Sequence, residues 1–153
     1  MLSNVQRSTG ARVTLAPACD GEIVGAVSSD DYASAAEFRS LLRRFLRHSE
    51  EVSRRHGLTP RQYLLLLMIK ASEGTQEPAT IGRLVESLAL TQSTVTELVQ
   101  RAEEAGLVTR RPSPDDGRVA HLSLTPVGAT RLHGAFTELG PERTRLAHAI
   151  RAG

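Results

Sequence analysis

The chain has 153 residues, which is enough for one domain with a hydrophobic core and short for two. Its hydrophobic fraction of 40% and charged fraction of 24% are typical of a soluble globular protein, and its longest apolar run, Leu64–Ile69, is far below the roughly 18 residues of a membrane span. The N-terminal residues lack the basic and apolar segments of a signal peptide, so we expect a cytoplasmic protein with no membrane partner. The formal net charge of +2 is only a weak indication of nucleic-acid binding, although every basic residue except Lys70 is an arginine, which pairs bidentately with phosphate and guanine.

Residues 1–29 and residues 30–153 differ in pattern. The first segment is rich in Gly, Ser, Thr and Ala and has no sustained period, so we expect a flexible tail or, alternatively, an arm that becomes ordered on a partner. From Asp31 to His56 apolar residues recur at steps of three and four, which predicts a helix that ends at Gly57.

A second helix is predicted over Pro60–Ser72. Thr59 and Gln62 form a capping box around it, and Pro60 suits its first position. This helix is apolar almost all round, so we expect it to be buried in the middle of the fold.

Two short helices follow in quick succession. Thr80 is a cap for Ile81–Leu88, and Thr91 is a cap for a helix that runs to Ala105 and ends at Gly106. Two helices joined by such a short turn are typical of a helix-turn-helix.

The period then changes to two. Leu107–Arg111 and Val119–Leu124 read as strands joined by the polar loop 112–118, which predicts a hairpin, or wing, after the helix-turn-helix. Helix resumes at Pro126 and is broken at Gly140-Pro141. The expected fold class is therefore mainly α with a small β-wing: a winged helix-turn-helix of about six helices and a two- to three-stranded antiparallel hairpin, with the helix-turn-helix and wing over residues 78–125.

The helix over residues 91–105 has the two faces that a major-groove recognition helix needs. Its expected inward stripe is Val95, Leu98, Val99, Ala102 and Ala105, and its opposite face is polar. We predict contacts to double-stranded DNA from Thr80, Thr91, Gln92, Ser93, Thr94, Thr96, Glu97, Gln100, Arg101, Arg110, Arg111, Asp116 and Arg118. The alternative is that any surface helix is polar outside.

The predicted wing loop supplies a second indication of DNA binding. Arg118 suits insertion into the minor groove, whose negative potential attracts arginine, and Asp116 is placed to hold that guanidinium or a neighbouring one. The alternative is a solvated turn, with Arg110 and Arg111 as ordinary charges at a strand edge.

Several runs closely resemble the multiple-antibiotic-resistance regulator (MarR) family. They are Leu90-Thr91-Gln92-Ser93-Thr94-Val95-Thr96, Glu103-Glu104-Ala105-Gly106-Leu107-Val108, Ser113-Pro114-Asp115-Asp116-Gly117-Arg118 and Leu122-Ser123-Leu124-Thr125-Pro126. The resemblance covers about residues 32–139. It implies a homodimeric winged-helix repressor, released by a small anionic or phenolic ligand or by thiol oxidation, with Asp116 and Arg118 in the wing motif.

The same resemblance assigns the flanking helices to dimerisation, over residues 30–72 and 126–153. It also places the effector cleft among those helices, for which the candidate residues are Phe38, Arg43, Phe45, Tyr63 and Phe136; the alternative is that the aromatics fill the core and the dimer interface. Three features depart from the family pattern: Glu97 replaces a frequent basic residue, Ala102 replaces a common leucine, and the region after Pro126 is short.

Other functions have weaker support. Cys19 is the one cysteine and has no cationic neighbour to activate it, so a redox role is a minor alternative. The histidines are too scattered for a metal site, and no cofactor or enzyme motif is present, so we expect no metal, no cofactor and no catalysis. The main alternative to a DNA-binding regulator is a winged-helix protein–protein interaction module, which Glu97, Glu103 and Glu104 near the recognition face would suit.

Overall fold

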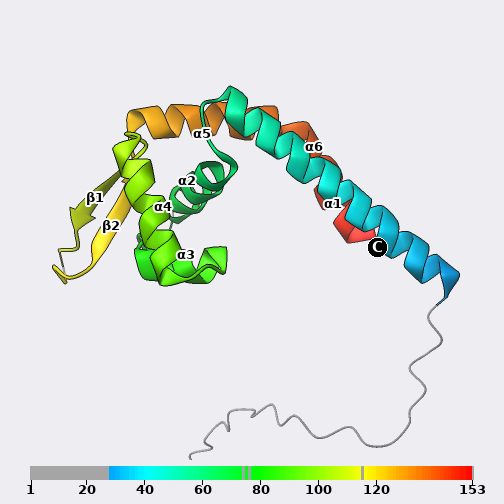
Figure 1. The fold of residues 1–153 in the computed structure, drawn as a ribbon, viewed down its shortest axis with the longest axis horizontal. Helices are drawn as coiled ribbons and strands as arrows, with labels where there is room; N and C mark the ends of the chain where they lie inside the picture. Colours follow the sequence, from blue (N-terminus) through cyan, green and yellow to red (C-terminus); the bar gives the residue numbers. More distant parts are fainter. Residues whose placement is uncertain (1–27, 74, 76, 115, 153) are drawn as a thin grey trace, which may run out of the picture.

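The computed structural model describes residues 28–73, 75, 77–114 and 116–152. Its elements, in chain order, are α1 (Ser29–Arg55), α2 (Pro60–Ser72), α3 (Ile81–Leu88), α4 (Gln92–Glu104), β1 (Val108–Pro112), β2 (Ala120–Leu124), α5 (Pro126–Glu138) and α6 (Gly140–Ala152). Figure 1 shows them as a lobe of α2, α3, α4 and the hairpin, joined through α5 to an arm in which α1 and α6 lie side by side. The predicted fold class is confirmed. Cys19 lies outside the described residues, as does the predicted tail except for residues 28 and 29.

Side-chain caps set the helix boundaries. Ser28 caps α1 by accepting from the Asp31 amide at 3.1 Å, while the Asp31 carboxylate accepts from the Ser28 amide at 2.8 Å. Because of this capping box the helix begins at Ser29, two residues before the predicted start, and residues 28 and 29 are not part of a tail. The predicted box of Thr59 and Gln62 is present, with 3.2 Å and 2.9 Å between its paired atoms, so α2 has the predicted bounds.

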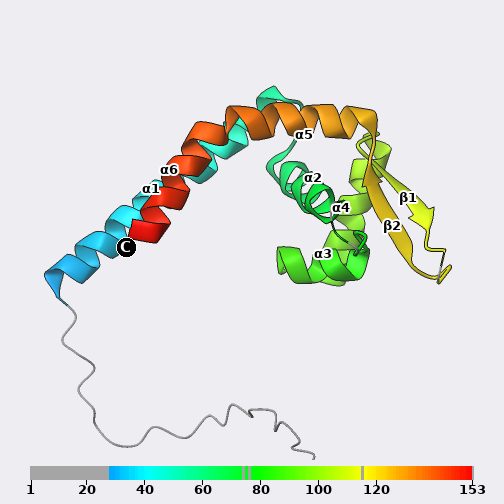
Figure 2. The same ribbon diagram turned by 180° about the vertical axis from the view of Figure 1, so that it is seen from behind.

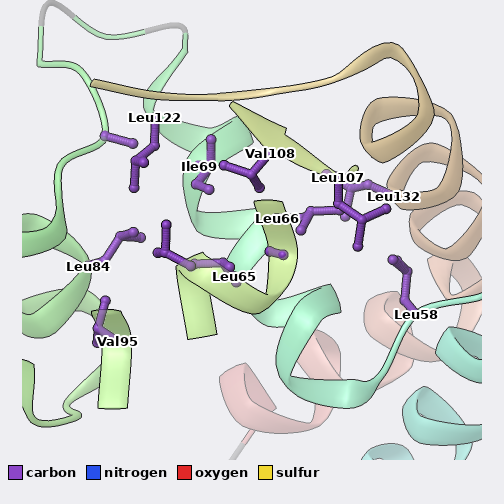
Figure 3. Packing of buried hydrophobic residues seen from close by; sticks show 13 residues of the cluster. Leu58, Leu65, Leu66, Ile69, Leu84, Val95, Leu107, Val108, Leu122 and Leu132 are labelled. Carbon is purple, nitrogen blue, oxygen red and sulfur yellow. The ribbon is translucent and has the colours of Figure 1, made fainter. Parts of the chain in front are cut away.

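The core lies around α2, as Figure 3 shows. Leu65, Leu66 and Ile69 are fully buried, and α2 contacts α1, α3, α4, α5 and β2. Leu64, however, is 42% exposed, so the expected burial of this helix in the middle of the fold does not extend to this face.

The hairpin is antiparallel and closely tied to its surroundings. Val108 pairs with Leu124 and Pro112 with Ala120, and a single bridge joins Leu122 to Ala79, whose carbonyl accepts from the Leu122 amide at 2.9 Å. Of the expected two to three strands, the described residues thus form two, with this isolated bridge beside β2. At the base of the hairpin the Thr125 hydroxyl donates to the Gly106 carbonyl at 2.7 Å, which fixes the start of α5 against the end of the recognition helix.

The end of α1 is bonded to the end of α5, the helix that joins the arm to the lobe. The His56 ring lies 2.8 Å from one Glu138 oxygen, and the Arg55 guanidinium bonds the other. Those bonds, from Arg55 first and then from His56, lower the pKa of Glu138. The carboxylate is therefore charged near neutral pH, and the contact is lost only in acid, as the pH falls through that lowered pKa.

Both helices of the arm carry apolar side chains that are exposed to solvent in the described protomer. Tyr32, Phe38, Leu46 and Ile150 are all large and exposed. In Figure 1 α1 lies in front of α6, and Figure 2 shows the same pair from behind with α6 in front. No helix in the described ranges has both the length and the hydropathy needed to cross a bilayer.

Candidate nucleic-acid interface

The α4 helix presents one buried and one open face, as predicted. Val95, Val99 and Ala102 are fully buried, so the small residue at 102 leaves no exposed gap. Leu98 is partly buried, but Ala105 is exposed, and its assignment to the inward stripe is wrong. The reason is that the helix ends at Glu104: Ala105 is the C-cap, and Gly106 at φ 69° turns the chain away.

Hydroxyl groups organise the first turn of α4. Thr91 caps the helix by accepting from the Thr94 amide at 3.3 Å, and its hydroxyl also lies 3.1 Å from that of Ser93 and 2.8 Å from that of Thr94. The Thr96 hydroxyl donates to the Gln92 carbonyl at 2.8 Å. Gln92 and Ser93 are exposed and can contact a base edge or a phosphate. The helical turn that carries them is already fixed by internal hydrogen bonds.

Thr80 has a different position. Its hydroxyl accepts from the Arg83 amide at 3.3 Å and caps α3, which is the helix before the recognition helix. Ala89, in the left-handed region at φ 51°, makes the turn between the two helices.

The acidic residues near α4 are all engaged with neighbouring side chains. Glu97 pairs with Arg101 one turn later, Glu104 accepts from the Gln100 amide at 3.1 Å, and Glu103 pairs with Arg110. The face therefore does not offer the free carboxylates that an acidic protein-binding surface would use.

The pair between Glu103 and Arg110 joins the end of the recognition helix to the first strand of the wing. The two side chains are 30% and 32% exposed, whereas Glu97 and Arg101 are 61% and 70% exposed. Arg110 was predicted as a DNA contact, but its guanidinium lies on Glu103 at 2.5 Å, where it holds the wing against α4. We propose that this pair positions the wing, and the DNA contact of Arg110 stays a prediction.

Replacing Glu103 with glutamine should weaken DNA binding by about threefold, because an exposed or half-exposed ion pair contributes up to about 1 kcal/mol to holding a geometry. Glu104→Gln removes the same charge and leaves the ion pair between Glu103 and Arg110 intact, so it serves as the control. The measurement is the dissociation constant on one duplex. Equal affinities of the two variants would show that the pair does not position the wing.

The wing loop is closed by main-chain bonds. Ser113 and Val119 are joined across it at 2.8 Å, and the Val119 amide donates to the Asp116 carbonyl at 2.9 Å. The Asp116 carboxylate accepts from the main-chain amide of Arg118 at 3.0 Å. Within the described residues Asp116 makes no ion pair with a guanidinium, so the expectation that it holds the Arg118 side chain is replaced by a role in shaping the turn from which the exposed Arg118 projects. Arg111 is exposed on β1, opposite His121.

The five residues predicted for an effector pocket do not share one cavity in the protomer. Phe38 and Phe45 line separate cavities of 590 and 320 Å³ along the arm, and Phe136 lines a third of 390 Å³ between α2 and α5. Tyr63 packs against the core, where burial raises the pKa of its hydroxyl and the charge of Arg143 opposes that rise. Arg43 is exposed and lines none of the three.

A cleft of 470 Å³ lies beside the recognition helix and brings in residues that sequence reasoning missed. Arg54 of α1 and Arg61 of α2 line it together with Thr94, Glu97 and Arg101 of α4. The signal that would have found Arg54 is its spacing of seven from Arg47, which places both on one face of a helix.

Known proteins share this architecture. The model of the MarR family matches residues 56–119. The organic hydroperoxide resistance transcriptional regulator of Bacillus subtilis is 38% identical over 73 residues, which is 48% of this chain and 47% of that protein. The HTH-type transcriptional repressor IacR of Pseudomonas putida is 53% identical over 36 residues, or 24% of this chain and 22% of that protein. The chain thus spans half or less of the length of these two curated relatives.

Solved structures extend the similarity over most of the fold. A MarR family transcription regulator is 25% identical with a TM-score of 0.63, covering 82% of this chain and 79% of that one. A mutant of MarR from E. coli in complex with operator DNA is 20% identical with a TM-score of 0.61, covering 76% of this chain and 81% of that one. The fold, the family model over the recognition helix and wing, and the predicted resemblance all agree. Residues 56–119 thus match the MarR family, and the described chain has the winged helix-turn-helix fold of MarR-family structures.

Proposed function

We propose that the protein is a sequence-specific regulator of transcription that binds double-stranded DNA, with α4 in the major groove and Arg118 of the wing at the minor groove. The observation that carries this proposal is the pairing of two features: a recognition helix whose first turn is fixed by Thr91, and a closed wing loop that presents an exposed arginine. The names of the relatives support it, since they include a repressor and a regulator bound to its operator. We infer repression as the mode of action and a cytoplasmic location, where bacterial DNA is found.

The protein acts as a homodimer in this proposal. The exposed apolar residues of α1 and α6 that lie away from the helix-turn-helix, such as Phe38 and Ile150, are where a second copy would bury surface. A two-fold axis through that contact presents two recognition helices to major grooves about 10 base pairs apart, so the operator is palindromic.

Binding to the DNA that flanks the protein's own gene tests this function. Saturable nanomolar binding to one palindromic segment, far tighter than to a scrambled duplex of the same composition, is the expected result. Weak binding that ignores sequence and disappears at physiological salt would reject a specific regulator.

The groove between α2 and α5 is a better candidate for the site of a small effector than the set of five residues first predicted, of which only Phe136 lines it. The groove is lined mainly by apolar side chains, among them Leu67, Leu132 and Phe136, with the Lys70 ammonium and the His133 ring beside them. Lys70 now bonds Glu73 at 2.6 Å, and an anionic aromatic ligand in the groove would compete with that carboxylate. The α5 side of the groove belongs to the helix that joins arm and lobe, so a ligand there acts on their relative position.

Lys70→Met should raise the dissociation constant of salicylate, a phenolic carboxylate used as the probe, by about tenfold, because it removes the cation and keeps the apolar stem. Lys70→Arg keeps the charge and should retain binding. Isothermal titration calorimetry measures both. Salicylate binding that is the same in all three proteins would place the effector elsewhere.

A further inference from the structure

The α1 helix carries a stripe of arginines that the functions described so far do not use. Arg39, Arg43, Arg47 and Arg54 are separated by four, four and seven residues, so they fall within about 80° of one another at about 100° per residue. All four are exposed. Among the described residues the first three make no ion pair or hydrogen bond, and Arg54 makes only an exposed contact of 3.4 Å with Glu50. Four neighbouring cations therefore face solvent with almost no internal neutralisation.

The direction of this stripe follows from what the other side of α1 contacts. Leu41, Phe45 and His48 line the cavity shared with α6, and they lie more than about 100° around the helix from the stripe. Arg54, by contrast, lines the cleft shared with α4. Figure 1 shows α1 and α4 on the side that faces the viewer, with α6 behind α1. The arginine stripe and the recognition helix thus belong to the same side of the molecule.

The cleft makes the two surfaces continuous. Arg61 lines it together with two ion pairs, Arg54 with Glu50 and Arg101 with Glu97, so the cleft runs from α4 across the first turn of α2 to α1 and carries one more cation than carboxylates. From Arg54 the stripe extends 15 residues along α1 to Arg39, or about 22 Å at a rise of about 1.5 Å per residue. In a dimer whose recognition helices are about 34 Å apart, the centre of the operator is about 17 Å from each. The stripe is therefore long enough to reach it.

We propose that the arginine stripe of α1 binds the phosphate backbone of the DNA between the two half-sites. The inference depends on the proposed function, and it adds a contact surface outside the helix-turn-helix and wing. A guanidinium group can donate two parallel hydrogen bonds to the oxygens of one phosphate, and it contacts no base. These contacts therefore strengthen binding to every sequence, and they fix the position of the duplex across the dimer. Arg43, first considered for an effector carboxylate, acts on DNA in this arrangement.

The variant Arg43→Gln/Arg47→Gln tests the stripe against a matched control, Arg44→Gln/Arg145→Gln. The control changes the same number of charges, but Arg44 of α1 and Arg145 of α6 line the cavity between these two helices. Four lost phosphate contacts per dimer should reduce the slope of log affinity against log salt by about 3.6, at about 0.9 per contact. The control should leave the slope unchanged. Equal slopes for the two variants would overturn the proposal, as would no change in either.

A duplex with neutral methylphosphonates at the central phosphates provides a readout that needs no variant. The wild-type dimer should bind it more weakly than the natural operator, and Arg43→Gln/Arg47→Gln should bind both duplexes equally. Wild-type binding that is indifferent to the neutral linkages overturns the stripe and leaves the regulator intact. Absence of specific binding by the wild type, on any natural duplex, instead rejects the proposed function itself. Sedimentation of each variant checks that it remains a dimer.

Discussion

Replacing Gly128 with alanine should lower the free energy of unfolding by about 3 kcal/mol, the largest stability effect that we expect from a single methyl group in this fold. A Cβ at this position would lie 2.1 Å from the carbonyl oxygen of Leu107 and 3.0 Å from its carbonyl carbon. Both neighbours are main chain, so neither can rotate away. The same carbonyl accepts from the Thr125 amide at 3.0 Å, which means that any shift also disturbs the start of α5.

Thermal unfolding at one fixed protein concentration measures this effect, since the stability of a dimer depends on concentration. A loss of about 3 kcal/mol corresponds to roughly 10 °C in Tm for a chain of this size. Gly82→Ala is the control: the nearest atom to its added methyl group is the Thr80 hydroxyl at 4.0 Å, so the substitution should be neutral or stabilising by about 0.5 kcal/mol. If Gly128→Ala melts with the wild type, then α5 does not start against the Leu107 main chain as described.

Arg118→Ala should weaken operator binding about 100-fold, because a dimer loses two minor-groove contacts of roughly 1 to 2 kcal/mol each. The exposed arginine projects from a turn whose main chain is already fixed, so little order has to be acquired on binding. The loss should be greatest for operators with A·T-rich flanks, where the narrow minor groove has the most negative potential. Titrations with operators of different flanking sequence measure both the loss and its dependence on sequence.

Two substitutions of Asp116 distinguish the role of its negative charge from the role of its hydrogen bond to the Arg118 main-chain amide. Asp116→Asn keeps an oxygen that accepts from the Arg118 amide, so it should retain most of the affinity, whereas Asp116→Ala should lose about half of the Arg118 effect in free energy. Were the carboxylate charge needed to hold the guanidinium, the asparagine variant would be as weak as the alanine variant. An Arg118→Ala protein within twofold of the wild type would rule out insertion of the wing.

Local chemistry explains why most of the fold could be predicted from the sequence. Thr59, Thr80 and Thr91 cap the helices that they were expected to cap, and Gly57 and Gly106 adopt the positive φ angles expected after a helix. Each of these signals depends on residues within four positions of one another. The order of helices and the position of the hairpin follow from them.

Features that depend on distant contacts could not be predicted in this way. The pairing of Arg110 with Glu103 depends on how the wing folds back on α4, and the bond from Asp116 to the Arg118 amide depends on the shape of the loop. The effector candidates do not share one cavity of the protomer, because their aromatic residues come from three helices whose relative directions no local pattern specifies. The arginine stripe of α1 was visible in the spacing, but the side of the molecule that it faces was not.

The projecting arm of α1 and α6 also has a consequence for gene dosage. A free protomer exposes Phe38 and Ile150, and in the proposed homodimer the DNA-binding species forms only when two such arms meet. At protomer levels below the dissociation constant of the dimer, the amount of dimer rises with the square of the protomer concentration, so halving synthesis reduces it about fourfold. Control of its own abundance would then change the occupancy of an operator more steeply than a monomeric binder of equal affinity allows.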